Sequence, residues 1–473
     1  MIEPISRRIM LKRAMLGFGS LALTDILARR SFADAATNPL IAKTPHFPPR
    51  AKRVIYIFLD GGLSHVDSYD YKPLLKRDDG KPLPASIAKP KFTFAPTGSL
   101  LKSPFAWKQW GQTGMWASEL FPQVNKLIDN FCFIHSLHHD NEDHFTAKNM
   151  IFTGSGREAR PPLGSWLAYG LGTENENLPA FIEIMPGAPK GASSAFLPAQ
   201  YGGTAIGRPD LKSKDRAWDN LRNASHGQRQ TLDLVQAMNK SHLLHTADDR
   251  ALEAEIQNME LAFRMQSTAP DLMSFENESE ATRELYGIGQ DMTDDFGRAC
   301  LMARRFAEKG VRYITLMHST RAFGNLWDQH KDLYDGHRNN AAAVDVPIAG
   351  LLRDLKSRGL LDDTLIMCGS EFGRTPVFEF QDGSEGRHRN GRDHNPHGFT
   401  MWFTGAGVKP GHRHGATDDY GYYAVQDKTT IFDLHATILH IMGLNHETLT
   451  YRHGGRDYRL TDVYGRVIGP MLA

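Results

Sequence analysis

Two short apolar runs, separated by about three hundred residues, constrain the fold of this chain most strongly. The first, Val54–Leu59, leads into Asp60-Gly61-Gly62, and the second, Thr364–Gly369, leads into Ser370-Glu371. Both runs are rich in β-branched and large aliphatic side chains, which is typical of buried strands in a parallel sheet. Because ligands bind at the carboxyl ends of such strands, we expect Asp60 and Glu371 to meet in one crevice.

The rest of the chain alternates between further apolar runs and helical patterns. Additional strands are predicted at 131–135, 180–185, 311–318 and 399–405, and helices at 117–130, 293–309, 340–358 and 431–439, with a further helix ending at Gly154. This alternation predicts an α/β fold with a mostly parallel sheet and helices on both faces. A charged, proline-poor stretch at about 210–290 predicts a helical insertion or cap over the sheet, and a separate interaction domain is the alternative.

Charge and cysteine content exclude several classes of protein. The net charge is +1, from 55 basic and 54 acidic residues, so no global field favours nucleic acid as a partner. The three cysteines, Cys132, Cys300 and Cys368, are far apart and odd in number. They predict no disulfide framework, and Cys132 and Cys368 lie in apolar runs typical of a core.

The first 36 residues have the pattern of a targeting segment. Ser6-Arg7-Arg8-Ile9-Met10-Leu11-Lys12 matches the twin-arginine export pattern, and Ala33-Asp34-Ala35-Ala36 fits a cleavage site. The apolar stretch between them is too short for a stable membrane anchor. We therefore expect export to the periplasm or the extracellular space, with residues 37–473 forming a single domain. A basic amphipathic starting helix is the alternative.

Acids and histidines at the predicted strand ends form a candidate metal site. Asp328 and His330 lie two apart, a spacing that places both side chains on one side of an extended segment. The full set of candidate ligands is Asp60, Asp328, His330, Glu371, His394 and His397. Oxygen and nitrogen ligands suit zinc, manganese, magnesium or calcium. Singly, each residue also fits a structural role, such as a turn aspartate at Asp60 or a buried pair between Glu371 and Arg374.

In this order, the motifs resemble those of the alkaline phosphatase superfamily, which includes sulfatases, nucleotide pyrophosphatases and phosphopentomutases. Asp60 matches the first metal-binding aspartate, and Thr153-Gly154 matches the pair that closes the nucleophile helix. The later matches are Trp327-Asp328-Gln329-His330, Glu371-Phe372-Gly373 and Asp393-His394. The resemblance implies an alkaline phosphatase-like fold and one or two divalent ions.

More closely, the whole chain is similar to a twin-arginine-exported branch of that superfamily, a sulfatase-like family known as a domain of unknown function. Its hallmarks resemble the segments 59–62, 327–330, 371–376, 391–394 and 455–463. Two positions depart from the hydrolase pattern. His144 stands at the nucleophile position, and Phe372 stands where the hydrolases have a histidine ligand.

The resemblance implies an exported, metal-dependent hydrolase of phosphate or sulfate esters, acting on a small-molecule or carbohydrate ester. His144 would act as base or nucleophile, while Lys148 and Arg374 would neutralise anionic charge. The alternative is a non-catalytic, metal-containing protein that binds an anionic polymer or glycan, and a third interpretation is a purely structural metal. Trp166, Trp327 and Trp402 are candidates for lining a cleft. The sequence leaves the oligomeric state undecided.

Overall fold

The computed structural model describes residues 40–87, 97–185, 193–207, 228–243, 259–261, 263–265, 272–275, 277–319, 326–379 and 391–473. The predicted twin-arginine segment and much of the predicted insertion lie outside these residues. All six predicted strands are present in the described chain. They are β1 (Arg53–Leu59), β5 (Cys132–His138), β6 (Phe181–Ile184), β8 (Tyr313–His318), β9 (Thr364–Gly369) and β12 (Phe399–Gly405).

These strands form the centre of one sheet, which has nine strands within the described residues. Its order is β13-β5-β12-β9-β1-β8-β6-β7, and β16 pairs with β5. Strand β1 lies between β8 and β9 and is parallel to both, whereas β12 runs antiparallel to its neighbours β5 and β9. The remaining members are β7 (Thr204–Ile206), β13 (Arg413–His414) and β16 (Thr429–Thr430).

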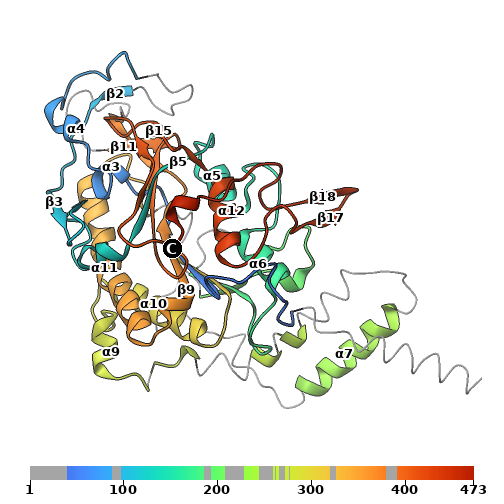
Figure 1. The fold of residues 1–473 in the computed structure, drawn as a ribbon. Helices are drawn as coiled ribbons and strands as arrows, with labels where there is room; N and C mark the ends of the chain where they lie inside the picture. The colour runs from blue at the N-terminus through green and yellow to red at the C-terminus, as the bar shows by residue number, and fades with distance from the viewer. Residues whose placement is uncertain are drawn as a thin grey trace, which may run out of the picture.

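Helices cover both faces of this sheet, as Figure 1 shows. On one side lie α10 (Asp294–Glu308) and α11 (Leu333–Ser357), and on the other lie α5 (His144–Thr153), α6 (Leu163–Leu171) and α12 (Ile431–Ile441). The side chains of β1 alternate between the two faces of the sheet. Ile55, Ile57 and Leu59 belong to the hydrophobic core on the side of α10 and α11. Val54, Tyr56 and Phe58 belong to the core on the side of α5, α6 and α12. A strand buried on both faces explains the unbroken apolar run, and the predicted fold class is confirmed.

Smaller elements surround the sheet. Strands β10 (Gly373–Glu379), β11 (Arg392–Asn395) and β2 (Thr97–Leu100) form a separate three-stranded sheet. The two-stranded pairs are β3 (Trp107–Trp110) with β4 (Met115–Ser118), β14 (Ala416–Thr417) with β15 (Ala424–Gln426), and β17 (Tyr451–His453) with β18 (Arg456–Tyr458). The short helices α3 (His65–Ser68) and α4 (Pro73–Arg77) follow β1, and 3-10 turns occupy Asn125–Asn130, Ala199–Tyr201, Leu361–Asp363 and Gly469–Met471.

Two helix predictions differ from the structure. The helix expected at 117–130 is wrong. Its first two residues belong to strand β4, which pairs antiparallel with β3. Only Asn125–Asn130 is helical, as a 3-10 helix. Pro122 lies between these parts and disfavours helical geometry before it. The helix expected at 340–358 begins earlier, at Leu333, because its buried stripe extends through His337 and Ala341.

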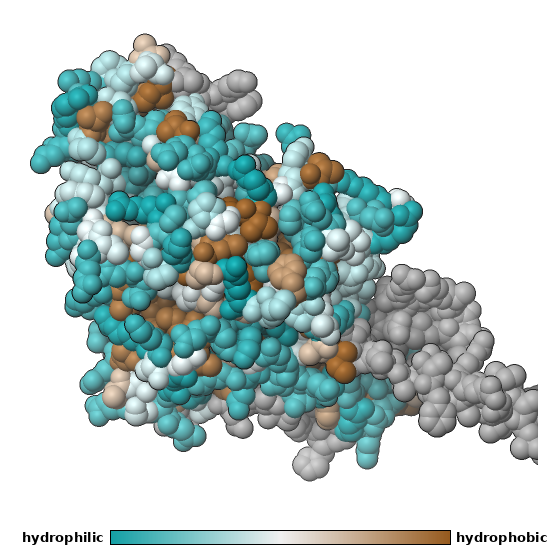
Figure 2. All heavy atoms as spheres, viewed as in Figure 1, coloured by the Kyte–Doolittle hydropathy of each residue, from teal (hydrophilic) through white to brown (hydrophobic). Residues whose placement is uncertain are grey.

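The predicted insertion contributes α7 (Gln228–Leu243) and α9 (Glu280–Leu285) to the described chain. Figure 1 shows α7 beside the body of the molecule. In the view of Figure 2 the surface is mainly hydrophilic, with apolar side chains in small groups. In the part of the chain that the structure describes, none of the helices combines the length and apolar character needed to cross a membrane. All three cysteines are buried and unpaired, which agrees with the core positions predicted for Cys132 and Cys368.

Candidate metal centre

Four side chains from three separate segments converge above the carboxyl ends of the central strands. His144 begins α5, Asp328 and His330 lie in the segment between β8 and α11, and His394 is on β11. One nitrogen or oxygen atom from each lies within 4.8 Å of the others. We call these four residues the metal cluster. Three of them were predicted as ligands from the sequence, and His144 was predicted as the catalytic base or nucleophile.

Asp328 lies at the middle of the metal cluster. Its Oδ1 lies 2.8 Å from Nε2 of His330 and 3.2 Å from Nε2 of His394. Its Oδ2 lies 3.1 Å from Nε2 of His144. The Nε2 atoms of His330 and His394 are only 3.0 Å apart. The same nitrogen of all three rings therefore points at one small volume.

The other nitrogen of each ring faces an oxygen that fixes the ring's tautomer. Nδ1 of His144 lies 2.6 Å from Oε1 of Glu371, and Nδ1 of His394 lies 2.6 Å from the backbone oxygen of Glu142. Nδ1 of His330 contacts Oε2 of Glu379. Since a carbonyl or carboxylate oxygen accepts the proton, Nδ1 is the donor, and in the neutral ring Nε2 keeps its lone pair. Such outer contacts orient histidine ligands in metal sites.

The carboxylates in and beside the metal cluster attract positive charge. Burial raises the pKa of Asp328, but its contacts with three histidines and the charge of Arg374 outweigh burial and hold this pKa well below its usual range. Burial lowers the pKa of His330, yet the carboxylates of Asp328 and Glu379 raise it to about 9. Burial lowers the pKa of His394 to about 4, so this ring stays neutral at pH 7. The carboxylates therefore draw a proton onto His330 and leave His394 able to ligate.

These residues fit a divalent metal. Nε2 of His144 is buried and, among the described residues, makes no hydrogen bond of suitable geometry despite its proximity to Asp328. Three imidazole nitrogens and one carboxylate oxygen form a donor set typical of zinc, and imidazole also suits other transition metals. Calcium and magnesium prefer oxygen ligands, so this nitrogen-rich set favours zinc among the four metals expected from the sequence.

Asp60 lies outside the metal cluster, in a contact with Lys148. Oδ1 of Asp60 accepts a 2.9 Å hydrogen bond from Nζ of Lys148, and Oδ2 accepts one of 2.6 Å from Oγ of Ser319. Asp60 is fully buried and Lys148 is 8% exposed. The ammonium group thus neutralises the carboxylate that was predicted to bind metal. Lys148, predicted to meet an anionic substrate, is held inside the protein by this contact.

Glu371 and His397 were also predicted as ligands, and the structure separates them from the metal cluster. Glu371 accepts hydrogen bonds from the backbone N–H of Gly61 at 3.1 and 3.2 Å and holds His144 from behind. The predicted proximity of the first strand and Glu371 is therefore present. His397 stacks on Tyr423, and its Nε2 lies 3.8 Å from Oε1 of Glu142.

Arg374 supports Asp328 from the protein interior. It is fully buried, and its Nη2 donates a 2.7 Å hydrogen bond to Oδ1 of Asp328. Nη2 also faces the backbone oxygens of Gly61 and Trp327, while Nε donates to that of Gly62 and Nη1 to that of Arg392. With its donors occupied in this way, Arg374 holds the ligand-bearing segments together, and no part of its side chain is exposed to a substrate.

Sequence reasoning missed Glu379, which contacts His330. Together with His330 and Asp393 it forms a second group of close ligand atoms. A signal was present, because Glu379 is an acid at the end of the buried strand β10, as Asp60 is at the end of β1. The three tryptophans predicted to line a cleft, Trp166, Trp327 and Trp402, are at most 3% exposed and belong to the core. That prediction is wrong.

Close to Asp60 lies a second buried acid, Glu183 on β6. Burial and the charge of Asp60 raise the pKa of Glu183 to about 8. Since the folded state holds this proton more tightly than the unfolded state, stability should fall as pH rises from about 4.5 to about 8. Glu183→Gln should remove this decline, which amounts to roughly 1.4 kcal/mol per pH unit at most.

The measurement is urea unfolding between pH 5 and 8 for the wild type and the Glu183→Gln variant. Glu447→Gln, at an exposed position, provides the control and should follow the wild type at every pH. Equal pH dependence in the wild type and Glu183→Gln would show that Glu183 is charged in the folded protein.

Comparison with known families gives the wider context. The family described as "Protein of unknown function (DUF1501)" matches residues 51–472. The chain belongs to this family. The match includes every residue of the metal cluster together with Glu371, Arg374 and Glu379. No curated protein matches the sequence.

Three solved structures illustrate what the DUF1501 chain is similar to. The lipoteichoic acid synthase LtaP from Listeria monocytogenes is 9% identical over 92% of this chain and 80% of its own, with a TM-score of 0.37. The PsFucS1 sulfatase from Pseudoalteromonas sp. is 13% identical over 84% and 68%, with a TM-score of 0.32. Alkaline phosphatase from the Antarctic bacterium TAB5 is 11% identical over 85% and 99%, with a TM-score of 0.33. Similarity at this level transfers neither activity nor substrate.

Proposed function

We propose that this DUF1501 protein is an exported, metal-dependent hydrolase of phosphate or sulfate esters. One observation carries the proposal: the Nε2 atoms of three histidines and the Asp328 carboxylate converge on one point, and an oxygen beside Nδ1 orients each ring. A purely structural network would not require three rings to present the same nitrogen to one centre. Export rests on the twin-arginine pattern in the first 36 residues.

A metal held by His144, Asp328, His330 and His394 would polarise an ester oxygen and lower the pKa of a bound water. Glu371 keeps Nδ1 of His144 protonated, so that Nε2 faces the centre. Arg374 holds Asp328, and Glu379 holds His330. Lys148 balances Asp60. We assign Lys148 and Arg374 to positioning rather than to direct contact with the ester.

His144 could act as a metal ligand or as a general base, and both roles use the lone pair of Nε2. A ligand and a general base both need an unprotonated Nε2, and one nitrogen cannot serve both purposes at once. Because Nε2 lies with the other donors, we assign His144 as a ligand, which leaves one ion rather than two at this centre. The Asp60–Lys148 contact supports the same count.

Metal analysis tests this assignment. Purified wild-type protein should hold about one equivalent of a divalent metal, and His394→Ala and His144→Ala should lose it. His397→Ala, which removes a histidine outside the metal cluster, should retain it. Elemental analysis after dialysis measures the content, and assays with p-nitrophenyl phosphate and p-nitrophenyl sulfate measure turnover. If His144→Ala keeps its metal but loses turnover, His144 is the base or nucleophile. Metal without turnover in the wild type would support a binding protein instead.

A further inference from the structure

The hairpin of β3 and β4 carries three tryptophans that lie outside the buried core. Trp107, Trp110 and Trp116 lie on these two strands, and Trp116 is 37% exposed. Trp107 and Trp116 contact Tyr71, with ring centroids 5.1 and 4.3 Å apart, and the Tyr71–Trp116 pair is stacked. Large aromatic groups left at the surface mark interaction sites more often than isolated apolar residues do.

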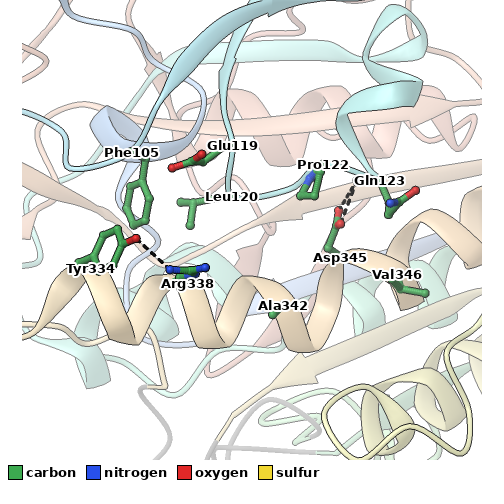
Figure 3. Close-up of a pocket in the computed structure, with 10 residues that line it drawn as sticks. All are labelled: Phe105, Glu119, Leu120, Pro122, Gln123, Tyr334, Arg338, Ala342, Asp345 and Val346. Atoms are coloured by element: carbon green, nitrogen blue, oxygen red, sulfur yellow. Dashed lines mark hydrogen bonds between the residues drawn. The ribbon is translucent and has the colours of Figure 1, made fainter.

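Two cavities flank this hairpin. One, of about 260 Å³, is lined by Tyr71 and Trp116 and by Arg413 of β13. The other, of about 460 Å³, is lined by Phe105, Tyr334 and Arg338. Figure 3 shows Phe105 facing Tyr334 of α11, with Arg338 hydrogen-bonded to the tyrosine hydroxyl. Phe105 and Tyr334 are stacked at 5.3 Å.

The two cavities share two features, a stacked aromatic pair and an exposed arginine, and both are also lined by carboxylates. Within the described chain, no carboxylate forms an ion pair with Arg338 or Arg413. The carboxylates that line the cavities already accept hydrogen bonds from the protein. Glu119 accepts from the N–H of Ala106, Asp345 from those of Gln123 and Val124, and Asp70 from the hydroxyl of Thr417 with Lys72 at 3.0 Å.

The cavities are connected along the chain. Met115 and Trp116 border the smaller one, and Glu119 and Leu120 border the larger one. Residues 115–118 are extended and residues 119–120 form a turn, so the chain between the two cavities spans at most roughly 16 Å. One ligand with several linked rings is long enough to reach both.

We propose that this hairpin and its two cavities bind an anionic oligosaccharide. Sugar rings have apolar faces that pack on aromatic rings, and their hydroxyl groups bond to polar side chains at the rim. Arginine recognises sulfate or carboxylate groups through paired N–H donors. Two separate concave sites suit successive sugar units better than the flat contact of a folded protein partner. The inference concerns binding and does not depend on turnover at the metal centre.

Titration calorimetry with defined polymers tests the proposal. The probes are dextran sulfate, polygalacturonate, neutral dextran and polyglutamate, at physiological salt. We expect at least one of the two anionic polysaccharides to bind ten times more tightly than polyglutamate or neutral dextran. The tighter of the two shows whether sulfate or carboxylate is preferred. Trp116→Ala should weaken binding about tenfold, and Arg338→Ala and Arg413→Ala should each weaken it severalfold.

Matched variants separate this surface from general effects. Tyr464→Ala and Arg452→Ala change an exposed aromatic and an exposed arginine elsewhere and should leave binding unchanged. Asp328→Asn alters the metal cluster and should also bind normally, so that loss of turnover and loss of binding are distinguished. Melting temperatures check folding, and the exposed Arg413→Ala serves if Trp116→Ala unfolds. Polyglutamate binding as tightly as the polysaccharides, or unchanged binding by the hairpin variants, would overturn the proposal.

Discussion

Replacing Asp328 by asparagine should remove the metal and lower ester hydrolysis at least about a thousandfold, a loss of some 4 kcal/mol of transition-state stabilisation. The reason is geometric: Asp328 contacts all three histidines of the metal cluster and is its only carboxylate. Asparagine keeps an oxygen for Arg374 but loses the negative charge. Alanine at this position would also remove the acceptor of the buried Arg374 guanidinium and so confuse folding with catalysis.

A second variant, Glu379→Gln, separates the loss of a metal ligand from the loss of a residue that orients a ligand. Glu379→Gln removes a charge that orients His330 without removing a ligand, so metal affinity should fall about 10- to 100-fold and activity should return with added metal. Asp328→Asn should not recover at any metal concentration that the protein tolerates. Metal titrations monitored by turnover of the more active p-nitrophenyl ester give both values. Full activity in Asp328→Asn would place the reacting centre elsewhere.

Strand positions in this protein are readable from sequence because the central strands are buried on both faces. Val54–Leu59 and Thr364–Gly369 have no polar interruption, and each supplies an acid at its carboxyl end. The meeting of these ends was therefore predictable. The sequence did not show which of the two acids would face the metal cluster. That depends on helix α5, where Lys148 bonds Asp60 and His144 bonds Glu371.

The β3–β4 hairpin shows a different limit. Residues 117–130 have helical composition, yet antiparallel pairing of Trp107–Trp110 with Met115–Ser118 decides the structure of the first part. A tertiary contact of this kind overrides local propensity. The tryptophans chosen from the sequence as cleft candidates, Trp166, Trp327 and Trp402, belong to the core, whereas Trp116 on β4 is 37% exposed. Size and aromatic character alone do not distinguish a core ring from a surface ring.

Arg374→Met should destabilise the protein by about 3–5 kcal/mol, the largest effect on stability that we expect from a single substitution here. The guanidinium is completely buried, and it joins β10 to the glycines after β1, to the segment carrying Asp328 and to β11. Methionine fills much of the volume but removes the hydrogen bonds that Arg374 donates to buried carbonyl oxygens and to the Asp328 carboxylate.

Urea unfolding at pH 7 measures this difference, with Arg358→Met as the control. Arg358 is also paired with carboxylates, at 2.7 and 3.1 Å, but its side chain is 39% exposed, so its loss should cost less than about 1 kcal/mol. Arg374→Lys should recover little stability, because one ammonium group cannot reproduce a planar fork that bonds in several directions. Equal costs for Arg374→Met and Arg358→Met would mean that the ligand-bearing segments are held by packing alone. In that case added zinc should raise the free energy of unfolding of Arg374→Met as much as that of the wild type, because the increase depends only on how tightly the folded protein binds zinc.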